Sequence, residues 1–291
     1  MSRGLERREL AGGWAFAESP RWHDGRLWLS EQLAGRVLAI SDTGQVEVIC
    51  EVASPMGLDW LPDGRLLAVS MSEWTVYVFN GQRVEPYCDL RGVCVGPPND
   101  IVVDSLGRAY VGNMGAKDFL TGEAPQPADL VLIDVDRRAR AVATDLLFAN
   151  GMVFTADGAT LIVAETFGHR LTAFRVDATD GSLFDRRVFA ELGRRTPDGI
   201  ALDSEGAVWV GSMETCEFLR VREGGEITDL IETVGRHAVA CALGGSNGRT
   251  LFMVTLENSE GVTDPTEGLR RGDSIARVEV STVPAKGMDF D

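Results

Sequence analysis

A β-hairpin signature recurs six times along the 291-residue chain. Each copy holds two short, largely apolar runs joined by a tight turn that ends in glycine. Segment 196–212, TPDGIALDSEGAVWVGS, is the clearest copy. A β-rich repeat of 39 to 51 residues is typical of propeller blades. The sequence therefore predicts an all-β fold, a six-bladed propeller of four-stranded antiparallel blades. The turn glycines are Gly25, Gly64, Gly107, Gly158, Gly206 and Gly248.

The repeat runs from end to end, so residues 1–291 are predicted to form a single domain. Blade 6 lacks a convincing fourth strand after Ser274–Val280. Leu5–Leu10 (LERREL) precedes blade 1 and is expected to supply that strand. Such an N-terminal strand would close the ring and leave no open sheet edge.

Composition narrows the class of protein. The chain is 44% hydrophobic, has no run of membrane-spanning length, and begins with a charged segment that argues against a signal peptide. Its five cysteines form no C-x-x-C pair, which predicts reduced thiols in a cytoplasmic protein. A net charge of −16 argues against nucleic acid and anionic membranes as partners. A small-molecule partner is expected, and the oligomeric state stays open.

The first strand of each blade lines the propeller axis, so equivalent positions on these strands converge. Four of the six residues found seven or eight positions before the turn glycines bear side-chain oxygens, and the other two are apolar. Buried carboxylates and carboxamides in one place need a positive partner. Calcium takes oxygen ligands of these types, and two carboxylates would match its charge. The six residues are Glu18, Met56, Asn99, Asn150, Asp198 and Ala240.

Asn and Asp before a strand are also common turn residues, and each of these positions taken alone favours that interpretation. Four oxygen-bearing residues at equivalent positions in six repeats favour a metal site instead. We therefore expect one divalent metal ion in the channel, with Ca²⁺ favoured over Zn²⁺, Mn²⁺, Mg²⁺ or Fe²⁺.

Five short segments resemble the signatures of the senescence-marker-protein (regucalcin)/gluconolactonase family. That family includes bacterial sugar lactonases and, more distantly, the squid-type diisopropyl fluorophosphatase. The resemblance spans the whole chain and implies a metal-dependent lactonase on a six-bladed propeller. The segments are Ala17–Trp22 (AESPRW), Pro98–Asp100 (PND), Ala149–Gly151 (ANG), Ala164–Thr166 (AET) and Pro197–Ile200 (PDGI).

The resemblance also implies residue roles. Glu18, Asn150 and Asp198 would be metal ligands, and Asp198 would double as the catalytic carboxylate. Asn99 would be a further ligand or a substrate contact. Regucalcin-like members often place a sugar-binding Arg two residues before this Asn, where the present chain has Pro97. Specificity for an aldonolactone is therefore not implied.

The chemistry also follows from the residue types. A cation there would polarise a lactone carbonyl and stabilise the oxyanion formed as water attacks. Asp198 would act as general base, or attack the electrophile itself. Two other functions stay open: a phosphotriesterase of the diisopropyl-fluorophosphatase type, and a non-catalytic calcium or small-molecule binding protein of the regucalcin type.

Other motifs are weaker. Gly244–Gly248 matches G-x-S-x-G, but its place in a hairpin turn argues against a nucleophile elbow. The three histidines lack zinc-site spacing. Long connections in blades 3 and 6 emerge on the metal side, and the first contains Phe119 and Leu120, which we predict to contact substrate. Trp22, Trp28, Trp60 and Trp209 are predicted to pack between blades rather than to form a ligand cage.

Overall fold

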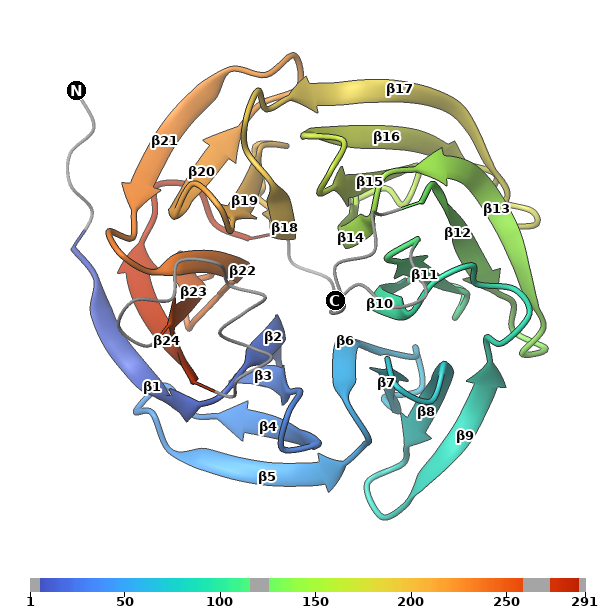
Figure 1. Ribbon diagram of the computed structural model, residues 1–291, viewed down its shortest axis with the longest axis horizontal. Coiled ribbons are helices and arrows are strands. Elements are labelled where there is room, and N and C mark those ends of the chain that lie inside the picture. Colours follow the sequence, from blue (N-terminus) through green and yellow to red (C-terminus); the bar gives the residue numbers. More distant parts are fainter. Residues whose placement is uncertain (1–5, 116–125, 259–272, 288–291) are drawn as a thin grey trace.

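The computed structural model describes residues 6–115, 126–258 and 273–287. These residues form six four-stranded antiparallel sheets arranged around a common axis (Figure 1). The predicted six-bladed β-propeller is confirmed. In every blade the first strand lies innermost (Figure 1).

Five blades are built from consecutive strands. Blade 1 is β2 (Ala17–His23), β3 (Arg26–Glu31), β4 (Arg36–Ile40) and β5 (Val46–Glu51). Blade 2 is β6 (Pro55–Trp60), β7 (Leu66–Ser70), β8 (Thr75–Phe79) and β9 (Val84–Asp89). Blade 3 is β10 (Pro98–Val103), β11 (Ala109–Asn113), β12 (Ala128–Ile133) and β13 (Ala139–Leu146). Blade 4 is β14 (Ala149–Phe154), β15 (Thr160–Glu165), β16 (Arg170–Val176) and β17 (Leu183–Glu191). Blade 5 is β18 (Pro197–Leu202), β19 (Val208–Ser212), β20 (Glu217–Val221) and β21 (Ile227–Glu232).

Blade 6 joins the two ends of the chain. It contains β22 (His237–Gly244), β23 (Thr250–Asn258) and β24 (Ser274–Thr282), and its outer strand is β1 (Arg8–Trp14), which pairs antiparallel with β24. The predicted closure by an N-terminal strand is therefore correct. Its predicted bounds, Leu5–Leu10, were wrong at both ends. The strand begins at Arg8, and two bulges carry it through Gly12 and Gly13 to Trp14.

The hairpin turns explain why glycine recurs. All six turn glycines have φ between 66° and 85°, a left-handed conformation in which a Cβ is strained. In blade 3, the Asp104 carboxylate also accepts the backbone N–H groups of Leu106 and Arg108, at 3.0 and 2.9 Å. Such Asx turns shape the hairpin from local sequence alone. The G-x-S-x-G segment lies in the β22–β23 turn, as predicted.

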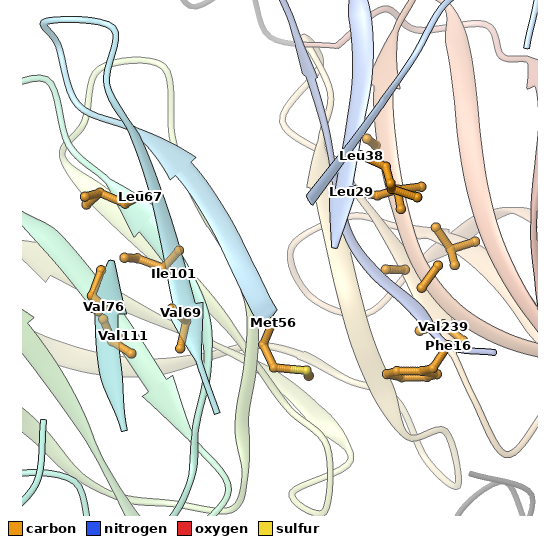
Figure 2. Packing of buried hydrophobic residues seen from close by; sticks show 14 of the residues in the cluster. Phe16, Leu29, Leu38, Met56, Leu67, Val69, Val76, Ile101, Val111 and Val239 are labelled. Carbon is orange, nitrogen blue, oxygen red and sulfur yellow. The ribbon is translucent and has the colours of Figure 1, made fainter. Parts of the chain in front are cut away.

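The hydrophobic core lies between the blades. Figure 2 shows apolar side chains of one large cluster, which links blades 1, 2, 3 and 6. The predicted inter-blade role of the tryptophans agrees with their packing. Trp22 stacks on Phe252 of blade 6 at 5.1 Å between ring centroids, and Trp28 meets Trp60 of blade 2 edge-on at 5.3 Å. Trp209 is fully buried.

Candidate functional site

The inner strands are irregular at the positions that the sequence singled out. In all six blades the pairing between the first two strands shifts register there, for example between Glu18 and Arg21 on β2 and between Pro197 and Ile200 on β18. β-bulges re-aim side chains and are common next to active sites. The bulges were not predicted from the sequence, and each lies at or next to a register position.

Glycines after the register positions let these strands approach closely. A Cβ on Gly151 would lie 2.6 Å from the carbonyl oxygen of Asp198, and a Cβ on Gly57 would lie 2.5 Å from the backbone nitrogen of Ile101. Only glycine fits at such separations. The sequence analysis did not single out these glycines, although each directly follows a register position.

The four oxygen-bearing residues come from four inner strands, β2, β10, β14 and β18. We call Glu18, Asn99, Asn150 and Asp198 the oxygen cluster. All four are buried, with 3% to 7% of their surface exposed. The Asp198 side chain lies close enough to those of Glu18 and Asn150 for each to shift its pKa, Glu18 upward through its negative charge and Asn150 downward.

The structure therefore brings the three predicted metal ligands together. Asn99 occupies the equivalent place on β10, but no hydrogen bond among the described residues joins it to the other three. Its two predicted roles, further ligand or substrate contact, both remain predictions.

Burial disfavours the charged forms of the two carboxyl groups in the cluster. Burial raises the pKa of Glu18 to about 7, against the lowering effect of the Ser19 backbone N–H, which lies 2.5 Å from its Oε2. Burial, and then the negative charge of Glu18, also raises the pKa of Asp198 well above its usual value. Two adjacent buried carboxylates favour either protonation or a bound cation.

Three further polar residues, Ser19, Arg21 and Asp100, form a hydrogen-bonded group next to Glu18. The Arg21 guanidinium pairs with both carboxylate oxygens of Asp100, at 2.7 and 3.0 Å. Ser19 donates to Asp100 at 3.3 Å and accepts the backbone N–H of Leu58 at 2.9 Å. Ser19 has φ of 52°, a costly conformation for a non-glycine residue, and it presents its own N–H to Glu18. Sequence reasoning missed these three residues, although Ser19 and Arg21 lie inside the AESPRW segment.

The donor types of the cluster suit a hard cation. Within the described ranges, no group of three or more His, Cys, Asp or Glu side chains could hold a metal. Two carboxylates with neighbouring carboxamides are instead the oxygen ligands that Ca²⁺ prefers. The residues present therefore fit a divalent cation of this kind.

The three histidines have structural partners. His169 bonds through Nδ1 with the carbonyl of Arg195 at 2.8 Å, His237 bonds likewise with Met213 at 3.0 Å, and His23 stacks on Trp60.

Other predictions are tested less fully. All five cysteines are free thiols. In the described part of the chain, no helix is long and apolar enough to cross a membrane. Phe119 and Leu120 lie outside the described residues, so their predicted substrate contacts stay predictions.

Comparison with known proteins now identifies the family. The model of the SMP-30/gluconolactonase/LRE-like region matches residues 16–257. The chain belongs to this family. That assignment confirms the resemblance found in the sequence.

Among curated relatives, 6-deoxy-6-sulfogluconolactonase of Pseudomonas putida is 30% identical over 54% of this chain and 53% of its own length. The chain thus matches about half the length of that relative. Pentonolactonase XacC of Haloferax volcanii is 26% identical over 91% of each chain. A solved luciferin-regenerating enzyme superposes with a TM-score of 0.81 at 16% identity over 98% of both chains, which shows the shared fold.

Proposed function

We propose that this protein is a lactonase that uses one divalent cation, with Ca²⁺ preferred. The observation that supports this most strongly is the oxygen cluster, in which two buried carboxylates of raised pKa meet a carboxamide at one end of the propeller axis. Arg21 is paired with Asp100, and although its charge lowers the pKa of Glu18, burial still raises that pKa, which supports a bound cation at the cluster. The lactonases among its relatives supply the reaction class.

The chain's own residues have distinct tasks in this proposal. Glu18, Asn150 and Asp198 would hold the cation, with Asn99 as a further ligand or as a donor to substrate. When bound, a divalent cation supplies Lewis-acid polarisation of the lactone carbonyl and stabilisation of the oxyanion. Asp198 would accept the proton of the attacking water as general base. Burial of the cluster would limit the access of bulk water.

The proposed substrates are lactones with fewer hydroxyl groups than gluconolactone. Pro97 has no side-chain donor, and its carbonyl accepts the backbone N–H of Met114 at 3.0 Å. Met56 occupies the cluster register in blade 2, and Figure 2 shows it projecting from β6 on the side that faces Phe16. Apolar groups at these positions favour aliphatic substituents over sugar hydroxyls.

The direct test is hydrolysis of a panel of γ-, δ- and sugar lactones, followed by proton release, in chelator and then with added Ca²⁺. Metal-dependent opening of lactones supports the proposal. Metal binding without turnover on any lactone would contradict it, and so would turnover of an organophosphate alone.

The role of Asp198 can be tested separately in a single turnover in ¹⁸O-water. A general base predicts that the label enters the hydroxy-acid product. Direct attack would open the lactone to a mixed anhydride of substrate and Asp198, and water attack on the Asp198 carbonyl of that anhydride would place the label in the Asp198 carboxylate. Label found in Asp198 would overturn the general-base assignment.

A further inference from the structure

Thr166 links two strands that carry proposed metal ligands. It follows β15 in blade 4 and is buried, with 8% of its surface exposed. Its hydroxyl donates to the backbone carbonyl of Pro197 at 2.8 Å, and Pro197 directly precedes Asp198 on β18. The same oxygen accepts a hydrogen bond from Nδ2 of Asn150 at 3.2 Å. The Asn150 amide, the Thr166 hydroxyl and the Pro197 carbonyl thus form a chain of hydrogen bonds from blade 4 to blade 5.

The donors and acceptors in this chain of hydrogen bonds can be arranged in only one order. A carbonyl can only accept, so Pro197 takes the single hydroxyl proton of Thr166. The Thr166 oxygen is then left as an acceptor, and only the NH₂ end of the Asn150 amide can bond with it. An amide rotated by 180° would set two oxygens with lone pairs against each other. The main chain of blade 5 therefore decides which end of the Asn150 side chain faces Thr166.

The fold of a blade does not require a hydroxyl side chain at the position of Thr166. Its backbone N–H donates to the carbonyl of Phe148, and the equivalent bond occurs in four other blades at 3.0 to 3.4 Å. A hydroxyl occurs at this position only in blade 4, among the five blades with this bond. The equivalent residues elsewhere are Gln32, Met71, Met114 and Met213.

We propose that Thr166 is a positioning residue that fixes the Asn150 amide with its carbonyl oxygen, Oδ1, directed to the cation. No hydrogen bond among the described residues uses Oδ1, whereas Nδ2 is bound to Thr166 and also interacts with the Asp198 carboxylate. An amide held the other way would present its NH₂ protons to a positive ion and lose one ligand. This inference rests on the proposed function, since it assumes that a divalent cation binds the oxygen cluster.

The test measures Ca²⁺ affinity by calorimetry on full-length protein freed of metal with a chelator. Thr166→Val keeps the side-chain shape but removes the acceptor, and it should raise the Kd for Ca²⁺ by about 10- to 100-fold, the usual effect of losing a group that orients a ligand. Thr166→Ser keeps the hydroxyl and should bind Ca²⁺ like the wild type. A Thr166→Ser variant as weak as Thr166→Val would overturn the inference, because lost packing would then be the cause.

The matched control is Thr233→Val. Thr233 is fully buried and its hydroxyl bonds with the carbonyl of Cys216 at 2.7 Å, with no link to the oxygen cluster. This variant should lower the melting temperature without changing the Kd for Ca²⁺. An equal rise in Kd for both valine variants would overturn the inference.

A double variant isolates the orientation itself. In Asn150→Asp both ends of the side chain are oxygens, so rotation no longer matters. Thr166→Val should then leave the Kd of Asn150→Asp unchanged, and a full 10- to 100-fold effect in that background would overturn the inference. If wild type binds Ca²⁺ and opens lactones while Thr166→Val binds equally well, only this inference fails. A wild type that binds no divalent cation would overturn both it and the proposed function.

Discussion

Replacing Glu18 by Gln should stabilise the metal-free protein at neutral and higher pH. Burial raises the pKa of Glu18 from 4.5 to about 7. Because the folded pKa lies above the unfolded one, the folded state binds the extra proton between these values, and its stability falls as pH rises through this window. A shift of about 2.5 units corresponds to about 3 kcal/mol at 1.36 kcal/mol per unit. Gln carries no charge at any pH, so the Glu18→Gln variant does not lose this folding stability as the pH rises.

The assay is thermal unfolding in chelator at pH 5 and pH 8. For a chain of 291 residues, about 3 kcal/mol corresponds to a rise in Tm of about 5 °C. We expect most of this rise at pH 8 and little at pH 5. With saturating Ca²⁺ the order should reverse, since wild type gains stability from binding the ion and Glu18→Gln gains much less.

Glu165→Gln is the matched control. Glu165 is also a fully buried glutamate, but hydrogen bonds from Arg170 and Thr172 outweigh burial and lower its pKa. This substitution should destabilise the protein at pH 8. If Glu18→Gln is no more stable than wild type at pH 8 in chelator, or if its advantage is equal at pH 5, the raised pKa of Glu18 is not the cause.

Two further predictions concern packing and specificity. Gly151→Ala should weaken Ca²⁺ binding and cost about 1–3 kcal/mol of stability, since its Cβ would lie 2.6 Å from the Asp198 carbonyl and would push β14 from β18. Calorimetry and urea unfolding check this, and unchanged values for both would show that the strands tolerate separation. Simple aliphatic lactones should have a higher kcat/KM than gluconolactone, because Pro97 offers no donor. The opposite order would show that other residues bind the sugar hydroxyls.

The hairpin repeat was readable because it depends on local chemistry. A left-handed turn needs glycine, and the six turn glycines with their flanking apolar runs gave the blade number. The register of Glu18, Asn150 and Asp198 followed, since equivalent positions in a closed ring must converge. Trp28 and Trp60 were placed between blades for the same reason.

The missed features depend on contacts between blades. The close approach of neighbouring inner strands at Gly57 and Gly151 is one example, since it is visible only when both strands are in place. The strand that closes the ring was predicted to end at Leu10, whereas bulges in its pairing with β24 carry it to Trp14. Residues that support the site, such as Arg21 and Thr166, lie inside the signature segments, but their partners are far away in sequence, so their roles could not be inferred from the segments alone.

The central claim is that the oxygen cluster binds a divalent cation that is needed for lactone hydrolysis. The most direct measurement is the rate of lactone opening by chelator-treated wild type, Asp198→Asn and Met56→Ala, before and after Ca²⁺ is restored. We predict that wild type loses activity in chelator and regains it, that Asp198→Asn stays inactive, and that Met56→Ala, in the same register on an apolar blade, recovers most activity. Full hydrolysis by chelator-treated wild type, or wild-type rates in Asp198→Asn, would contradict the account.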